Sequence, residues 1–169
     1  MSWSPVHALY RRHWVPRPLP ETFAFFERPE NLPRITPPRL AMRIRTPPPI
    51  RMARGLTIDY TIRVFGLRRH WRSLISEYDP PTSFRDVQVL GPYRRWDHRH
   101  RFWPEDGGTV IEDLVAYELP LGPVGGLVNR IAVRRELEAI FDFRQAQIDT
   151  LLAVTGSPAT TERRELEDG

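Results

Sequence analysis

The stretch RWDHRHRFWPEDGGTVIEDLVAY, residues 95–117, carries the signal that decides the fold. Its first half alternates with period two, which is the spacing of a half-buried β-strand. One face of this strand holds aromatic rings and imidazoles, and the other holds charged side chains: Trp96, His98, His100 and Phe102 against Arg95, Asp97, Arg99 and Arg101. The motif PEDGG at 104–108 is a strong hairpin signal, so residues 109–117 are predicted to form the return strand.

Further strands are predicted on the N-terminal side of this hairpin. The clearest period-two run places five apolar residues on one face, namely Leu56, Ile58, Tyr60, Ile62 and Val64. Other runs lie at residues 8–15, 40–45, 71–76 and 84–90, and prolines and glycines separate several of them. We therefore expect one antiparallel sheet of about seven strands.

Helices are predicted in two places. Residues 20–32 follow a proline-rich break and favour one or two short helices after the first strand. From about residue 122 to 154, apolar positions recur every three or four residues, which predicts one long C-terminal helix with Gly156 as its stop. We expect a single domain over 1–154 and a mobile polar tail over 155–169.

The order of these elements predicts the architecture, an α+β fold. A sheet with one apolar face needs a cover, and only the long C-terminal helix is large enough to supply it. A strongly curved sheet wrapped around one helix leaves a space wherever the facing side chains do not fill it. Small apolar ligands bind in spaces of this kind. The sequence therefore predicts a cavity between the sheet and the C-terminal helix.

Composition narrows the classes of function. The chain of 169 residues has room for one domain, and it contains no cysteine, which excludes disulfides, thiolate zinc sites and cysteine nucleophiles. No apolar run approaches the roughly 18 residues that span a bilayer, and the N-terminus lacks the apolar region of a signal peptide. We therefore expect a cytoplasmic protein without a transmembrane segment. The sequence has no phosphate loop and no Ser–His–Asp order, and we expect no cofactor.

The basic residues are all arginine, and they are unevenly distributed. Residues 34–101 carry 15 arginines against five acidic residues, whereas residues 102–169 carry six against 13. A basic region can attract nucleic acid or an anionic surface. These arginines are dispersed, however, and not clustered as in an arm or a recognition helix. We interpret them as decorating the outer faces of strands, and we expect no specific nucleic-acid partner.

Motifs over residues 8–152 resemble one known family. They comprise Gly55, Asp59 and Tyr60 in GLTIDY; Trp71; Phe84, Asp86 and Gln88 in FRDVQ; GPYRRWDHRHRF at 91–102; Gly108, Thr109, Asp113, Val115 and Tyr117; LPLGPVG at 119–125; and Leu137, Ile140, Phe141, Phe143 and Arg144. The chain resembles the helix-grip fold of the START, Bet v 1 and polyketide cyclase/dehydrase superfamily, and within it the bacterial SRPBCC ligand-binding proteins. The resemblance implies a sheet gripping the C-terminal helix. It implies no particular ligand and no catalytic set. Some of these relatives carry a second, epimerase-like domain, and we expect none in this sequence.

The candidate site residues lie on the faces expected to point inward. Burying the arginines of the 95–102 strand in the core would cost far more free energy than burying its imidazoles. We therefore expect His98 and His100 to face the cavity. There they would bind a polar head group or act as acid and base, or else be core histidines paired with a tyrosine or carboxylate. The predicted ligand-binding set is Tyr60, Trp71, Trp96, His98, His100, Phe102 and Phe141.

The roles of the nearby carboxylates stay open at this point. Glu112 and Asp113 lie on opposite faces of the return strand, and a one-residue slip in register decides which one meets the histidines. Asp86 either lines the cavity or faces an edge of the sheet. We expect no metal ion, because carboxylates would have to complete a site that begins with two histidines.

Three functions are compatible with these patterns. The first is non-enzymatic binding of a small hydrophobic molecule of lipid, polyketide, isoprenoid or quinone type. The second is a cyclase- or dehydratase-type enzyme that uses His98 or His100 with Asp113 as acid and base. The third is an interaction protein that binds an acidic partner through an arginine-rich face.

Overall fold

A single curved sheet and one long helix make up most of the structure. The computed structural model describes residues 7–64, 66–120 and 122–153. These residues form a seven-stranded antiparallel sheet in the order β1-β7-β6-β5-β4-β3-β2. The elements are β1 (His7–Val15), α1 (Leu19–Phe26), 3-10 helices at Pro29–Ile35 and Pro38–Leu40, β2 (Arg43–Ile44), β3 (Thr57–Val64), β4 (Leu67–Asp79), β5 (Ser83–Leu90), β6 (Arg95–Glu105), β7 (Gly108–Glu118) and α2 (Gly122–Leu151).

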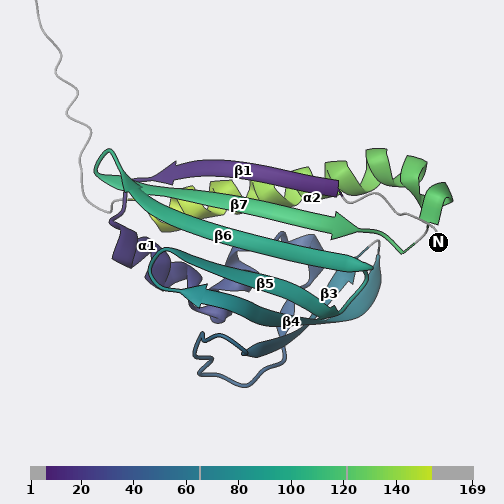
Figure 1. The fold of residues 1–169 in the computed structure, drawn as a ribbon, viewed down its shortest axis with the longest axis horizontal. Helices are drawn as coiled ribbons and strands as arrows, with labels where there is room; N and C mark the ends of the chain where they lie inside the picture. Colours follow the sequence, from purple (N-terminus) through teal and green to yellow (C-terminus); the bar gives the residue numbers. More distant parts are fainter. Residues whose placement is uncertain (1–6, 65, 121, 154–169) are drawn as a thin grey trace, which may run out of the picture.

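The helix α2 runs along one face of the sheet behind β1 and β7, and the short helices lie on the same side (Figure 1). Leu137 and Phe141 of α2 pack against Val115 and Tyr117 of β7. Ile148 packs into a second cluster, which includes Phe23 of α1. The predicted helix-grip arrangement, with short helices after the first strand and a long C-terminal helix, is confirmed. Gly156 and the tail 155–169 lie outside the described residues.

The β6–β7 hairpin closes where the sequence predicted it. The two residues between the strands, Asp106 and Gly107, both have positive φ, at 49° and 74°. Such a pair matches the twist of the flanking strands, and aspartate followed by glycine adopts it readily. The next residue, Gly108, lies so close to β1 that a Cβ atom there would collide with the Val15 carbonyl oxygen. This closure fixes the register of every pair along β6 and β7.

The strand predicted over residues 40–45 is wrong for most of its length. Only Arg43–Ile44 pair with β3, as the short edge strand β2. The preceding residues form a turn of 3-10 helix, and Ala41 follows it in the left-handed region with φ at 44°. Pro37 and Pro38 set the backbone angles of this turn, and that local constraint outweighs the alternation of apolar side chains.

Candidate functional site

A cavity of about 170 Å³ lies between the sheet and α2. Strands β3 to β6 and helix α2 form its walls, and α1 with the short helices closes one end. Six side chains of the predicted ligand-binding set line it: Tyr60, Trp71, Trp96, His98, His100 and Phe141. The seventh, Phe102, is not among the lining residues that the structure describes. It is 2% exposed because Phe23 and Phe26 of α1 cover its ring.

Aromatic rings form one side of the cavity. Tyr60 stacks on Trp71 across β3 and β4, with ring centroids 5.7 Å apart and an interplanar angle of 16°. Trp71 in turn meets the edge of Trp96 at 5.3 Å and 87°. Edge-to-face contacts of this kind stabilise aromatic pairs beyond the burial of their area. This wall presents rigid apolar surface to anything in the cavity.

The floor of the cavity carries a cluster of four ionisable side chains, three of them buried and one, Asp86, partly buried. They come from three neighbouring strands, because the register sets His98 of β6 opposite Asp86 of β5 and His100 of β6 opposite Asp113 of β7. His98 and His100 are each 4% exposed, and Asp113 is 6% exposed. Asp86 and the two histidines line the cavity. We call Asp86, His98, His100 and Asp113 the polar floor.

The two imidazoles of the polar floor lie between the two carboxylates. Asp113 Oδ1 is 2.9 Å from His98 Nε2 and 2.8 Å from His100 Nδ1. Asp86 Oδ2 is 3.2 Å from His100 Nε2 and 3.7 Å from His98 Nδ1. The imidazole centroids are 3.8 Å apart. Each histidine therefore presents one nitrogen to Asp113 and its other nitrogen to Asp86.

This geometry displaces the pKa values of the cluster in opposite directions. Burial would raise the pKa of Asp113, but hydrogen bonds and charge from His100 and His98 hold it well below its ordinary value. Burial and the neighbouring His100 lower the pKa of His98. Although burial opposes it, contact with Asp113 and Asp86 raises the pKa of His100. The two carboxylates thus favour the protonated form of His100, whereas burial and His100 disfavour the protonated form of His98.

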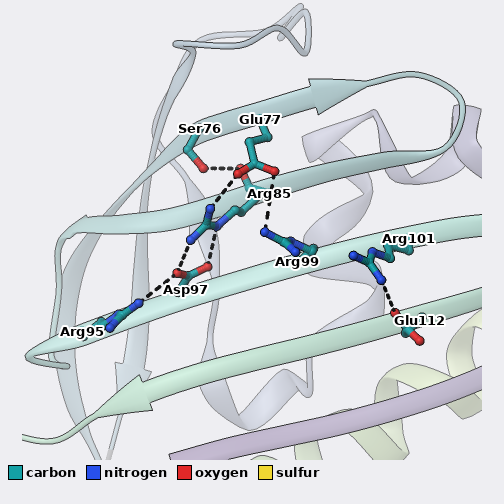
Figure 2. A network of polar contacts seen from close by, with 8 residues as sticks. All are labelled: Ser76, Glu77, Arg85, Arg95, Asp97, Arg99, Arg101 and Glu112. Carbon is teal, nitrogen blue, oxygen red and sulfur yellow. Dashed lines mark hydrogen bonds and ion pairs between the residues drawn. The ribbon is translucent and has the colours of Figure 1, made fainter. Parts of the chain in front are cut away.

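The register also decides the open question about the return strand. Asp113, not Glu112, faces the histidines. Glu112 lies on the outer face, where it accepts a hydrogen bond from Tyr10 at 3.0 Å and lies 3.6 Å from Arg101 (Figure 2).

A profile of the family described as "Polyketide cyclase / dehydrase and lipid transport" matches residues 15–142. The chain belongs to this family. The match begins at Val15, the last residue of β1, and ends within α2, so it includes all three strands that carry the polar floor. A comparison with curated proteins found no match.

Solved structures of other members of this fold are similar across most of the chain. Protein TTHA0849 from Thermus thermophilus is 17% identical with a TM-score of 0.68, over 88% of this chain and 100% of that one. Major latex-like protein 151 from Panax ginseng is 11% identical with a TM-score of 0.65, over 88% and 98%. The nucleoside-diphosphate sugar epimerase from Corynebacterium glutamicum is 25% identical with a TM-score of 0.60, over 84% of this chain but 28% of its own.

The sequence did not assign two residues of the site. It left open whether Asp86 lines the cavity or faces an edge of the sheet, and it did not indicate Arg144 as a site residue. Asp86 belongs to the cavity, and its pKa is lowered despite burial because His100 donates to it and His98 and Arg144 lie near. Arg144 of α2 lines the cavity, with its guanidinium 5.2 Å from the Phe141 ring. Its position three residues after Phe141 on a helix was the available signal. Gln88, which shares a strand face with Asp86, is not among the described lining residues of the cavity. Its side-chain amide donates a hydrogen bond to the Tyr93 backbone carbonyl.

The outer face of β5 and β6 carries a separate network of charges (Figure 2). Arg85 donates two hydrogen bonds to Asp97, at 2.7 and 2.6 Å, and one to Glu77 at 2.6 Å. Arg95 and Arg99 approach the same carboxylates at 3.4 and 3.9 Å. These arginines are outward-facing residues engaged with acids of the same sheet. A function for an arginine-rich face stays a prediction, and salt-dependent retention on heparin would test it.

The described helices include none that is both long and apolar enough to cross a membrane.

Proposed function

We propose that this protein binds a small hydrophobic molecule of lipid, polyketide, isoprenoid or quinone type in the cavity under α2, without transforming it. The observation that carries the proposal is the cavity itself, an apolar space with an aromatic wall and a polar floor. Ligand sites in proteins combine these features, since apolar walls supply affinity and a few polar groups orient the ligand. Membership of a family described by polyketide cyclisation and lipid transport supports the same class of ligand.

The polar floor also restricts the kind of ligand. His100 and Arg144 bring positive charge and hydrogen-bond donors to the cavity, and Asp86 brings an acceptor. A ligand with an oxygen at one end and an apolar body would satisfy both parts of the site. Pure hydrocarbons would leave the buried polar groups without a new partner.

A binding assay tests this proposal directly. Native mass spectrometry of freshly purified protein is expected to show co-purified ligand mass, and delipidated protein is expected to bind an environment-sensitive fluorophore that palmitate, farnesol or a short-chain quinone displaces. Replacing Ile140, which lines the cavity, by tryptophan should fill the space and prevent the fluorophore from binding. The matched control is Leu114→Trp, at an exposed position of β7. A clean apo mass together with no displaceable binding would refute the proposal.

A second candidate function rests on the opposite pKa displacements of His98 and His100. A neutral imidazole beside a protonated one can accept a proton at one point of a substrate and donate one at another, as dehydration and cyclisation require. Asp113, which contacts both rings, would hold them in place. Turnover in a substrate screen that is lost in both His98→Ala and His100→Ala would favour this enzyme, and turnover that both variants retain would exclude these roles.

A further inference from the structure

The polar floor brings three metal-ligating side chains to one point. Asp86, His98 and His100 each offer one ligand atom, and these atoms lie within 4.8 Å of one another. The Asp86 Oδ2 atom is 3.2 Å from His100 Nε2 and 3.7 Å from His98 Nδ1. Donor atoms bound at about 2.1 Å to one tetrahedral ion lie about 3.4 Å apart. Both distances from Asp86 are close to this spacing.

The fourth member of the floor sits where an orienting residue belongs. Histidines that bind metals direct their second ring nitrogen to a carboxylate, which fixes the ring and its tautomer. Asp113 Oδ1 contacts the second nitrogen of both rings, at 2.9 Å for His98 and 2.8 Å for His100. Asp113 itself is not among the described lining residues of the cavity. One buried carboxylate thus hydrogen-bonds to His98 and lies in charge contact with His100, while the other nitrogens of both rings face Asp86.

One ring nitrogen of the cluster lacks a well-aligned hydrogen bond. The His100 Nδ1 atom is fully buried, yet within the described part of the chain it forms no hydrogen bond of good geometry. Its 2.8 Å approach to Asp113 is a charge contact only. Burying a carboxylate is costly unless cations or hydrogen bonds compensate it, and here Asp113 is buried and Asp86 is partly buried beside the two imidazoles. A divalent cation bound by Asp86 and the imidazoles would add positive charge beside both carboxylates.

We propose that Asp86, His98 and His100 bind a divalent transition-metal ion at the floor of the cavity, with Asp113 as the positioning residue. Two imidazoles and one carboxylate are a ligand set for such ions, and it leaves coordination positions unfilled by protein. We expected no metal from the sequence because carboxylates would have to complete the site, and Asp86 from β5 is a carboxylate in that place. Because all three ligands line the cavity, the open positions would accept an oxygen of the bound molecule, a detail that rests on the proposed function.

The test uses full-length protein without a histidine tag, stripped with a chelator. Titration with Zn²⁺ by calorimetry, and with Co²⁺ by its visible absorption, is expected to show one site with micromolar affinity or better. Asp86→Asn should weaken binding by about 100-fold, and Asp113→Asn by about 10- to 100-fold. The control is His70→Gln, because the wild-type His70 imidazole lies outside the cavity, 2.8 Å from Asp59. It should leave the affinity unchanged.

Nitrogen NMR of the wild-type protein tests the same site without any variant. Adding Zn²⁺ should shift His98 Nδ1 and His100 Nε2 and leave the imidazoles of the other three histidines unchanged. Millimolar affinity, equal affinity in Asp86→Asn, or shifts confined to other histidines would each overturn the metal site. Displacement of the fluorophore is followed in parallel. Metal binding without ligand binding would refute the proposed function alone, and ligand binding without metal binding would refute the metal site alone.

Discussion

His100 of β6 lies directly opposite Asp113 of β7, and the distance between His100 Nδ1 and Asp113 Oδ1 is 2.8 Å. The pairing follows from the hairpin register set at Asp106 and Gly107, several residues away along the strands. A slip by one residue would have turned Glu112 inward and Asp113 outward. The chemistry of the cavity floor thus depends on the backbone of a surface turn.

Replacing Asp113 by asparagine should destabilise the fold strongly. The substitution keeps the size of the side chain but leaves two buried imidazoles without their common carboxylate, which costs about 3–5 kcal/mol when a buried ion pair loses one partner. Urea denaturation with a chelator present measures the free energy of unfolding. The neighbouring Glu112→Gln, on the outer face, should cost less than about 1 kcal/mol. Equal losses in the two variants would contradict the inward position of Asp113.

Acid should weaken the outer charge network in a way that depends on Asp97. Hydrogen bonds from Arg85 outweigh partial burial and lower the pKa of Asp97. The unfolded chain therefore takes up this proton at a higher pH than the folded protein does. The stabilisation is present at neutral pH and is lost as the pH falls through the folded pKa, which lies below the ordinary carboxyl value. Solvent screening limits the effect to about 1 kcal/mol.

The measurement for Asp97 is the free energy of unfolding at about pH 7 and about pH 3, around the ordinary carboxyl pKa. Asp97→Asn should be less stable than the wild type at neutral pH, and the difference between the two proteins should shrink in acid. If the difference between the two proteins were the same at both pH values, the lowered pKa would be wrong.

Phe102 and Trp96 share a strand face but should behave differently when shortened. Phe102 is 2% exposed in the core beneath α1, whereas Trp96 lines the cavity. Phe102→Leu should lower stability by about 1–3 kcal/mol through imperfect packing and leave the affinity for the fluorophore unchanged. Trp96→Leu should weaken fluorophore binding several-fold with a smaller loss of stability. A loss of affinity in Phe102→Leu alone would place the ligand deeper than the observed cavity.

A methyl group at Gly108 should be poorly tolerated. The added Cβ atom would collide with the Val15 carbonyl oxygen and lie 2.6 Å from the Trp14 ring, so β1 would have to move away from β7. We expect Gly108→Ala to lower the free energy of unfolding by at least about 2 kcal/mol. Gly107→Ala meets no neighbouring atom within 4 Å but keeps a positive φ, so it should cost about 1–2 kcal/mol. Thermal melts of both variants measure which substitution lowers the stability more.

The sequence by itself determined the local periodicities and the order of elements. Alternation along 95–102, the turn residues at 104–108 and the three-to-four spacing after residue 122 each depend on neighbouring residues only, and the helix-grip fold follows from their order. It also placed His98 and His100 inward, since the opposite choice would bury arginines. Where a local constraint opposed the periodicity, as the prolines before residue 41 did, the strand prediction failed.

Only the tertiary structure decided which side chains meet. Asp86, His98 and Asp113 come from three different strands, and their convergence depends on registers that no period-two pattern specifies. The same holds for Arg144, which reaches the cavity because α2 crosses the sheet at one particular position. Periodicity gives the face on which a residue lies, whereas pairing gives its neighbour. The polar floor therefore exists because of which residues pair across β5, β6 and β7.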